Sequence, residues 1–474
     1  MLKKLFTHSL IYSLAPQAPK LASLFLMPII TRHATALDYG IYGIITSYLF
    51  FATALKDLGL GVVFVNTFYK HEKKWPIIWR LLHGHLILWG FIFAFILLLL
   101  LKVAIPAEAN KNFWTIAALT ILPSVLFDTT SLIGNYYFRF SLKPIFIGII
   151  TVTTGVLTVF ATYYFIVVLE RGYMGWFVAS FISSFCMFLF YFYPVYVKLK
   201  LIPIVTFRKK FIMPHFKVAL PMIPHNYSSY LLNSSDRVIM NQFKVNINQI
   251  GQYNIAYNFG NYFESVGEAI GMAVGPFYSK LYTSKKSSAL EDERNFTFFL
   301  MTGFLVGTFV VSLWLKEIFL LLISNKELRS AYDIGGIIIM SYAYRPMYWS
   351  AGIKLSIYEK TSVLWRISFI AGVINVLLNI IFIRQFGIYA AAISTMISLL
   401  YMGFAGYFFK SYKKLKGLNH YPFAWLGAII LLTIIFYLLK DVSVFFKIAI
   451  TLAVMFFWIF WVKKNWKSLK NIDV

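Results

Sequence analysis

The sequence predicts an all-α polytopic membrane protein of about fourteen transmembrane helices. Three observations lead to this class. Hydrophobic residues occupy 59% of the 474 positions and charged residues only 13%, whereas an average soluble domain carries roughly 25% charged residues. Apolar runs of about 20 residues, the length that spans a hydrocarbon core of about 30 Å, recur along the whole chain. Lysines and arginines concentrate in every second connection between these runs.

The apolar runs define the expected helices in chain order. The first follows a basic start but contains Pro16, Pro19 and Lys20, so we expect a retained first span rather than a cleaved signal. All connections are short, and the single cysteine, Cys186, allows no intrachain disulfide. The expected spans lie near residues 9–30, 41–65, 82–101, 113–135, 145–168, 173–197, 217–239, 253–277, 296–322, 333–353, 363–383, 388–409, 422–439 and 444–462.

The basic residues support this count and set the orientation. The N-terminus, the C-terminus and every second connection together hold 28 lysines and arginines, and the opposite side holds 9. Cytoplasmic loops of membrane proteins are enriched in Lys and Arg, so both termini are expected in the cytoplasm. The same rule accounts for the net charge of +26, and we therefore expect no nucleic-acid partner.

The chain also predicts an internal duplication. A glycine–tyrosine element before the second span (Gly40 and Tyr42) recurs before the eighth (Gly251 and Tyr253), six spans later. Such parallel repeats are common in transporter folds. The expected division is an N-terminal six-helix lobe at 1–197, a basic cytoplasmic linker at 198–216, a C-terminal six-helix lobe at 217–411, and a two-helix hairpin with a basic tail at 412–474.

Cations inside the expected spans are the most informative polar residues. An ionisable side chain at mid-bilayer costs about 2.5–3.5 kcal/mol on insertion scales, so it normally faces protein or an aqueous cavity. Lys20, Lys56 and Arg345 lie deepest, and Arg237 lies nearer a span end. A buried structural ion pair is the alternative for the first three, and snorkelling to the headgroups is the alternative for Arg237. Because such cations suit phosphate, pyrophosphate or carboxylate, we expect these four residues to bind an anionic substrate.

Carboxylates in the same spans are candidates for ion coupling. Glu264 and Glu268 lie one turn apart beside a polar stripe in the eighth span, so they could share a proton or a cation. Asp57 and Asp128 are the other acidic candidates. Burial favours the protonated form of a carboxyl group and would let it exchange protons near neutral pH. We expect no cofactor, and a proton or sodium gradient as the source of energy.

The stretch LFLMPIITRHATALDYGIYGIITSYLFFATALKDLGLG at 24–61 resembles the opening of the Wzx-type polysaccharide (O-antigen) flippases. These belong to the multidrug/oligosaccharidyl-lipid/polysaccharide (MOP) exporter superfamily. Their pattern comprises a proline-bearing first span, a Thr-Arg pair, a D/E-Y-G element, a D-x-G-L sequence and a G-x-x-G/A-A-A segment before the twelfth span. The matching positions here are Pro28, Thr31–Arg32, 38–42, 57–60 and 387–392.

The resemblance implies two six-helix lobes around a central cavity, sometimes with two extra C-terminal helices. It implies a secondary transporter of the bacterial inner membrane. Such proteins move undecaprenyl-pyrophosphate-linked oligosaccharide, an O-antigen, capsule or exopolysaccharide repeat unit, from the cytoplasmic to the periplasmic leaflet by alternating access. Cationic cavity residues are thought to meet the pyrophosphate, a role carried over to Lys20, Lys56, Arg345 and Arg237. The expected partners are this substrate, membrane lipids, and, as further candidates, a polysaccharide polymerase and other glycan-assembly membrane proteins.

Two other functions are considered. A cation-coupled multidrug exporter of the same superfamily should present carboxylates to its substrate, as Glu264 and Glu268 could, but the first span offers Lys20 instead. An integral-membrane polysaccharide polymerase or ligase needs catalytic residues on a large external loop, whereas the longest external connection here spans only residues 240–252. We expect a transporter rather than an enzyme.

Metal and nucleotide chemistry find no support in the sequence. His83 and His85 are two positions apart and point to different sides of a helix, and no other cluster has the spacing of metal ligands. No phosphate-binding glycine motif of the Walker or dinucleotide type occurs. We therefore expect no metal site and no direct coupling to ATP.

Overall fold

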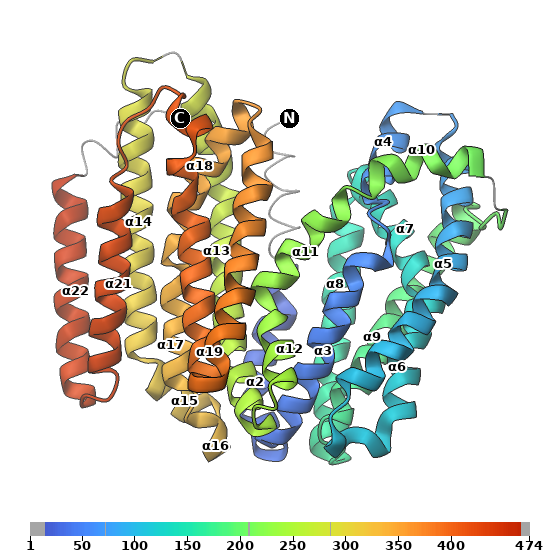
Figure 1. Ribbon diagram of the computed structural model, residues 1–474, viewed down its shortest axis with the longest axis horizontal. Coiled ribbons are helices and arrows are strands. Elements are labelled where there is room, and N and C mark those ends of the chain that lie inside the picture. The colour runs from blue at the N-terminus through green and yellow to red at the C-terminus, as the bar shows by residue number, and fades with distance from the viewer. Residues whose placement is uncertain (1–14, 72, 207–208, 285, 466–474) are drawn as a thin grey trace. The chain divides into compact units, whose positions relative to one another are not determined.

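The computed structural model describes residues 15–465 apart from 72, 207, 208 and 285, and within these ranges it contains helices and no strand. The chain divides into two compact units, Met1–Tyr227 and Ser228–Val474, whose helices are labelled in Figure 1. The predicted all-α class is confirmed. The boundary between the units falls beyond the predicted linker at 198–216, and the four-part division of the chain stays a prediction.

The first unit is a bundle in which α8 packs on α9 and α2, and α5 packs on α3 and α6. Short π-helical turns, η2 and η3, extend α8 and α9 at their ends. The helix α11 (Met222–Asn233) crosses the boundary to the second unit. The other elements are α2 (Gln17–His33), α3 (Ala36–Lys56), α4 (Gly61–Lys70), α5 (Trp75–Ala104), η1 (Ala107–Asn112), α6 (Phe113–Leu126), α7 (Asp128–Phe140), α8 (Pro144–Tyr163), η2 (Tyr164–Val168), α9 (Met174–Phe192), η3 (Tyr193–Lys198) and α10 (Lys209–Ala219).

The second unit is built around α13, which packs on α17, α18 and α14. The last two helices, α21 and α22, lie against α14 and α17 and form the antiparallel pair at the red end of the chain in Figure 1. The elements are α12 (Ser235–Gln242), α13 (Ile247–Thr283), α14 (Ala289–Leu313), α15 (Leu315–Leu322), α16 (Lys326–Arg329), α17 (Tyr332–Ser341), η4 (Tyr342–Tyr344), α18 (Arg345–Ile357), α19 (Thr361–Phe404), η5 (Ala405–Phe408), α20 (Lys410–Lys413), α21 (Pro422–Leu439) and α22 (Val444–Lys464).

The helices follow the expected spans, but their number is not settled by length and composition. Among the described residues, eight helices are long and apolar enough to cross a membrane, or nine when the bent pair α6–α7 counts as one span. Fourteen therefore stays a prediction. Residues 9–14 of the first expected span, Lys3 and Lys4, and the basic tail from 466 lie outside the described residues.

The prolines of α2 fit the way this helix begins. The helix starts at Gln17, with Pro16 as its N-cap, and Pro19 lies in the first turn, where a missing amide hydrogen costs no helical bond. A side chain at Gly155 of α8 would place its Cβ 2.2 Å from Pro19 Cγ. The ring of Pro19 therefore packs directly on the backbone of α8, and only Pro28 lies in the helix interior.

Two chain breaks require glycine. Between α3 and α4, Leu58 has φ 51° and Gly59 has φ 70°, and a Cβ on Gly59 would fall 2.3 Å from the carbonyl oxygen of Ala219 in α10. Within α19, Gly387 adopts φ 55° and ψ −132° and divides the segment into two helices. A positive φ carries little cost for glycine; Gly387 lets the chain break between the expected spans at 363–383 and 388–409, whereas the break at Gly59 falls within the expected span at 41–65.

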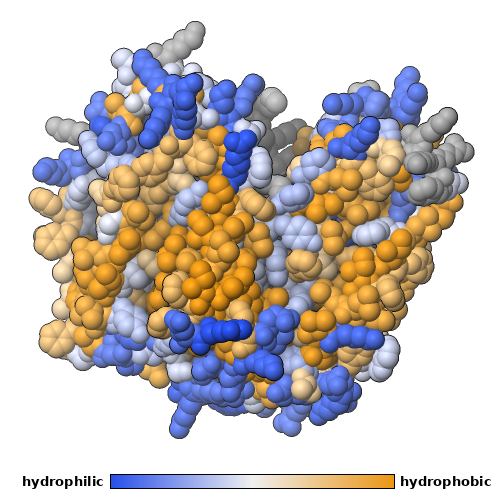
Figure 2. Space-filling view, viewed as in Figure 1, coloured by the Kyte–Doolittle hydropathy of each residue, from blue (hydrophilic) through white to orange (hydrophobic). Residues whose placement is uncertain are grey.

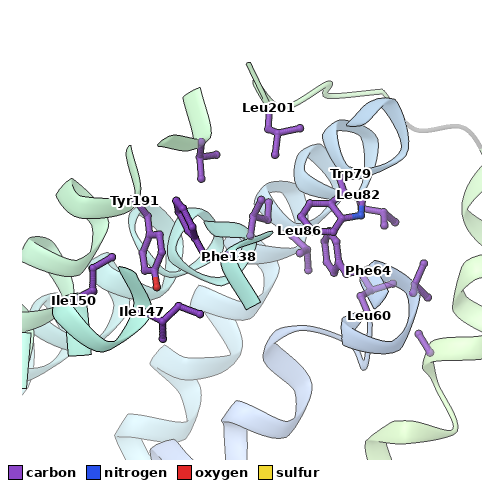
Figure 3. Packing of buried hydrophobic residues seen from close by; sticks show 14 residues of the cluster. Leu60, Phe64, Trp79, Leu82, Leu86, Phe138, Ile147, Ile150, Tyr191 and Leu201 are labelled. Atoms are coloured by element: carbon purple, nitrogen blue, oxygen red, sulfur yellow. The ribbon is translucent and has the colours of Figure 1, made fainter. Parts of the chain in front are cut away.

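The core of the first unit is rich in aromatic residues (Figure 3). Trp79 and Phe64 are both fully buried and meet edge to face, with ring centroids 5.1 Å apart, the arrangement that aromatic rings prefer. The indole nitrogen of Trp79 donates to Thr67 Oγ1 at 3.0 Å. Because a buried indole N–H needs an acceptor, this contact fixes α5 against α4.

The outer surface is strongly apolar. Figure 2 shows hydrophobic side chains over the middle of the helices and hydrophilic ones near the helix ends. Large side chains such as Phe91, Phe95 and Phe160 are more than 60% exposed. Exposed apolar surface of this extent, on helices of spanning length, identifies a multi-pass membrane protein.

Ion pairs attach the C-terminal helix pair to the rest of the second unit. Lys447 of α22 is fully buried, and its ammonium donates to both oxygens of Glu317 at 2.8 Å. At the turn between α21 and α22, Asp441 accepts from Lys316 at 2.6 Å, and Lys440 donates to Asp333 at 3.1 Å. The pair is thus fixed by specific charges in addition to apolar contact.

Candidate functional site

The motif residues that begin α3 position the candidate site of the first unit. Thr35 caps the helix, since its hydroxyl accepts from the amide of Asp38 while the Asp38 carboxylate accepts from the amide of Thr35, a capping box. The same carboxylate accepts from the amide of Tyr173 at 2.8 Å. The D-Y-G element therefore holds the start of α9 against the start of α3, and both helices line the pocket that follows.

Lys56 and Asp128 form an ion pair in this pocket of the first unit. The ammonium of Lys56, at the end of α3, contacts Asp128 Oδ2 at the start of α7. Both side chains are partly exposed, at 33% and 26%, to a pocket of about 180 Å³. The hydroxyl groups that line it come from three helices: Thr46, Thr53, Thr120, Ser124, Ser180 and Ser184. A cation, a carboxylate and several hydroxyls thus face one small polar space inside an otherwise apolar bundle.

Asp57 does not share this pocket. It ends α3, and its carboxylate accepts from the amide of Gly59 at 3.1 Å, within the positive-φ turn. Adjacent residues of a helix point about 100° apart, so Lys56 pairs with Asp128 although Asp57 is its neighbour in sequence. In this structure the D-x-G-L sequence forms the turn between α3 and α4.

Arg345 and Glu264 form the corresponding pair in the second unit. Arg345 Nη2 donates to Glu264 Oε1 at 2.7 Å, and the side chains are 9% and 25% exposed. The Tyr342 hydroxyl donates to the other carboxylate oxygen at 3.2 Å. A Cβ on Gly267 would fall 2.8 Å from Arg345 Cδ, so the absent side chain lets the arginine lie across α13. The Nε of Arg345 is buried and has no hydrogen-bond partner among the residues that the structure describes.

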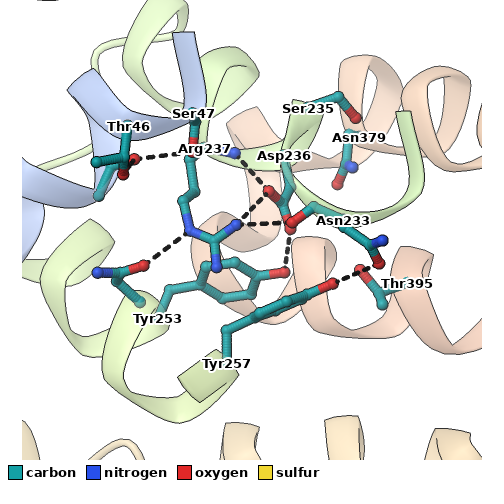
Figure 4. Close-up of polar contacts among 12 residues, drawn as sticks. Thr46, Ser47, Asn233, Ser235, Asp236, Arg237, Tyr253, Tyr257, Asn379 and Thr395 are labelled. Atoms are coloured by element: carbon teal, nitrogen blue, oxygen red, sulfur yellow. Dashed lines mark hydrogen bonds and ion pairs between the residues drawn. The ribbon is translucent and has the colours of Figure 1, made fainter. Parts of the chain in front are cut away.

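Arg237 is enclosed by polar and aromatic groups, as Figure 4 shows. Its Nε donates to Asn254 at 3.0 Å and its Nη1 to the carbonyl of Asn233 at 2.9 Å. Its guanidinium lies 4.4 Å from the ring centre of Tyr257. The neighbouring Asp236 is fully buried and accepts from the Tyr253 hydroxyl. These contacts join α12 to α13 and leave the charge of Arg237 largely compensated within the unit.

The remaining predicted residues are more exposed. Lys20 is half-buried on α2, where its carbonyl accepts from Ser23 at 2.8 Å. Glu268 is exposed on α13, one turn after Glu264, and adds negative potential at Arg345. The structure therefore brings together Lys56 with Asp128, and Arg345 with Glu264. Both cations thus have the carboxylate partner considered above as the alternative to a cation free for substrate, and in each case that carboxylate is one expected to couple ions.

A buried polar cluster in the second unit was not found by sequence reasoning. Asn375 and Asn379, one turn apart on α19, are fully buried with Thr395, and Asn375 lies within hydrogen-bond reach of Ser235 and Thr395. Within the described ranges, the amide oxygen of Asn379 has no hydrogen-bond partner. The i, i+4 spacing of two asparagines in an apolar span is a visible signal, since polar residues at membrane depth are functional candidates. Within the described residues no group of three His, Cys, Asp or Glu side chains could hold a metal ion.

Two known protein families match this chain. The polysaccharide biosynthesis protein family matches residues 5–282, more than half of the chain. The chain belongs to this family. The MatE family matches residues 221–381 of the same chain, so both halves carry signals of the MOP superfamily, and the predicted relationship is confirmed. Among curated proteins, none matches the sequence significantly.

Several solved structures share the fold of this protein. The lipid II flippase MurJ in an inward closed conformation superposes with a TM-score of 0.74 at 13% identity, covering 97% of this chain and 99% of MurJ. An inward-facing multidrug resistance MATE family transporter of the MOP superfamily gives 0.60 at 14%, covering 92% and 96%. A MATE transporter of Vibrio cholerae, VcmN, gives 0.51 at 14%, covering 87% and 96%. At these identities the likeness shows a common fold.

Proposed function

We propose that this protein is a secondary transporter that moves an undecaprenyl-pyrophosphate-linked oligosaccharide from the cytoplasmic to the periplasmic leaflet of the bacterial inner membrane. Its membership of the polysaccharide biosynthesis family and its fold, shared with a lipid II flippase, support this proposal. The cargo is a repeat unit of O-antigen, capsule or another surface polysaccharide. A proton or sodium gradient drives transport by alternating access.

The observation that carries the proposal is the pairing of one cation with one carboxylate in each unit. Lys56 meets Asp128 in a polar pocket, and Arg345 meets Glu264 beneath Tyr342. Arg345 also keeps a buried Nε–H without an acceptor, so its guanidinium can still donate to a further oxygen. An unsatisfied buried donor costs about 1–3 kcal/mol, and an incoming phosphate oxygen would remove that cost.

Such pairs can link substrate binding to ion movement by exchange of partners. A pyrophosphate oxygen and the carboxylate compete for the same cation, because each accepts the same charge-assisted hydrogen bond. When the pyrophosphate takes Lys56 or Arg345, the displaced carboxylate loses its counter-ion in a poorly hydrated site and binds a proton or a sodium ion instead. Release of the substrate restores the internal pair, so the state of the carboxylate depends on whether the cation holds substrate.

Flipping in proteoliposomes tests this function. The substrate is an undecaprenyl-pyrophosphate disaccharide placed in the inner leaflet, and an enzyme added outside modifies only the sugar that reaches the outer leaflet. Lys56→Gln and Arg345→Gln should each lower the initial rate about tenfold, since each removes a charged donor worth about 1.5–3 kcal/mol. Lys102→Gln, an exposed charge at the end of α5, is the matched control and should leave the rate unchanged. Rates for Lys56→Gln and Arg345→Gln equal to the control, at equal protein content, would overturn the proposal.

Multidrug export is the second candidate, favoured by the MatE match over 221–381. That segment contains Glu268, an exposed carboxylate that could attract a cationic drug. The same proteoliposomes decide between the two, using a cationic dye in place of the lipid. Saturable dye efflux that Glu268→Gln abolishes, without flipping of the lipid-linked sugar, would establish the exporter and exclude the flippase.

A further inference from the structure

A second polar pocket lies wholly within the second unit, away from the pairs described above. It has a volume of about 510 Å³ and is lined mainly by the segment 407–424 that joins α19 to α21. Its wall includes Lys354 of α18, which is only 2% exposed. Placing an ammonium in such a position is costly unless an acceptor meets it.

The surroundings of Lys354 supply aromatic rings rather than an acceptor. Its Nζ lies 4.5 Å from the ring centre of Tyr412 and 5.9 Å from that of Tyr282. A Cβ on Gly417 would fall 2.3 Å from this Nζ, so the ammonium lies directly against the chain that lines the pocket. Within the described part of the chain, no hydrogen bond or ion pair reaches Nζ.

A second donor in the same pocket is also unused. The hydroxyl of Tyr412 is buried, and none of the described residues gives it a hydrogen-bond partner. The carboxylate of Glu293 acts electrostatically on Lys354 and Tyr412 but is hydrogen-bonded elsewhere, because it accepts from Ser350 at 2.7 Å and Thr297 at 2.9 Å and contacts His420 Nε2 at 2.9 Å. The pocket therefore offers one ammonium and one hydroxyl, both without an acceptor, and an anion is the missing partner.

An apolar groove adjoins this pocket. It has a volume of about 700 Å³, and Phe408 lines both spaces. Its walls are aliphatic and aromatic side chains of α19 and α21, and Lys410 stands among them, while Lys413 lines the polar pocket. The apolar wall comprises Ile397, Leu400, Tyr401, Phe404, Leu426 and Ile430.

We propose that these two spaces together bind an anionic phospholipid. The phosphate accepts from Lys354, Tyr412 and Lys413, and an acyl chain lies in the groove between α19 and α21. The basic connection at 410–421 is predicted on the cytoplasmic side, where anionic lipids are concentrated and where basic pockets between helices bind their headgroups. This lipid is a resident ligand rather than the transported substrate, so the site does not depend on the proposed transport function.

Lipid retention by the purified full-length protein tests the site. The protein is equilibrated in mixed micelles containing equal fractions of phosphatidylglycerol and phosphatidylcholine, and the bound lipid is quantified by mass spectrometry. Phosphatidylglycerol should be enriched about tenfold, because the choline cation of phosphatidylcholine cancels the net negative charge that pairs with Lys354. Lys354→Met should abolish the enrichment, whereas Tyr412→Phe should lower the amount of bound phosphatidylglycerol about threefold and Ile430→Trp should lower that amount by filling the groove. Lys414→Met, an exposed charge in the same connection, is the matched control and should change nothing.

Each outcome bears on the proposal. Equal retention of the two lipids, or the same enrichment in Lys354→Met as in Lys414→Met, would overturn it. Displacement of the lipid by millimolar inorganic phosphate, together with no effect of Ile430→Trp, would show a site for a soluble anion and also overturn it. If Lys354→Met does not fold, Tyr412→Phe and Ile430→Trp decide, since an unchanged amount of bound phosphatidylglycerol in both excludes the site.

Discussion

Replacing Glu264 with glutamine should strengthen substrate binding, which is unusual for a substitution at a functional site. In the mechanism proposed above, Glu264 competes with the pyrophosphate for Arg345, so its neutralisation would leave the guanidinium to the substrate. Glutamine keeps the side-chain oxygen that accepts from Tyr342 and nearly the same volume. The change therefore removes a charge with little effect on packing.

The magnitude follows from the geometry of the pair. At 2.7 Å and an effective dielectric constant of about 20, the gross Coulomb attraction is about 6 kcal/mol. Desolvation offsets much of it, and a carboxylate that is 25% exposed is partly screened by solvent. The net contribution of the ion pair, like that of one charge-assisted hydrogen bond, is then about 1.4 kcal/mol. Removing this competition corresponds to about a tenfold gain in substrate affinity.

Equilibrium binding measures this gain. The ligand is a water-soluble analogue that carries the pyrophosphate and sugars on a short prenyl chain, and the protein is held in detergent at low salt. Arg345→Gln should weaken binding about tenfold, and the double variant Arg345→Gln/Glu264→Gln should bind like Arg345→Gln alone. Glu327→Gln, at an exposed position of α16, is the control. Unchanged or weaker binding by a folded Glu264→Gln variant would refute the competition between carboxylate and substrate.

Three further outcomes are expected. Asp128→Asn should bring the ratio of flipping rates with and without an ion gradient close to one, because an amide cannot exchange a proton; an unchanged ratio in proteoliposomes removes Asp128 from coupling. Gly336→Ala should lower stability by about 2 kcal/mol, measured as a fall in Tm, because its Cβ would lie 2.0 Å from the buried ring of Phe436. Asp441 should stabilise the turn between α21 and α22 only above acid pH. The ammonium of Lys316 holds the pKa of Asp441 below its usual value of 3.8, so stability is present above that value and lost as pH falls through the lower pKa.

Matched measurements make the last two outcomes decisive. A Cβ on Gly427 of α21 meets nothing within 4 Å, so Gly427→Ala should leave Tm unchanged or raise it slightly. Equal effects of Gly336→Ala and Gly427→Ala would contradict the packing argument. For the turn, the difference in Tm between the wild type and Asp441→Asn should be constant from about pH 5 to 8, begin to fall at about pH 4, and disappear only once Asp441 is protonated in the folded protein. A difference that persists in acid would exclude the ion pair as its cause.

Sequence reasoning found the fold because membrane burial constrains long segments strongly. Apolar length and the distribution of basic residues identified helices throughout the chain, including the C-terminal pair. The glycine-bearing motifs at 57–60 and 387–392 were recognised as family elements, and the structure adds that Gly59 and Gly387 let the chain break there. These glycine motifs can be recognised in the local sequence because each spans only a few residues.

The partners of the charged residues could not be found in the same way. Lys56 and Asp128 are 72 positions apart, and Arg345 and Glu264 are 81 apart. Their pairing depends on how α3 packs near α7 and how α13 packs on α18, which hydrophobic periodicity does not specify. The sequence therefore predicted charged side chains at membrane depth. It did not predict that candidates for substrate binding would pair with candidates for ion coupling.

The attachment of the C-terminal helix pair has a practical consequence. In α22 a single residue, Lys447, is buried, whereas side chains such as that of Phe457 point outward. A spectroscopic label on this outer face would disturb no core contact. The ion pair between Lys447 and Glu317 would hold the labelled helix rigidly to the second unit. Distances from such a label to one placed on the first unit would test whether the two units move relative to one another, as the proposed alternating access requires.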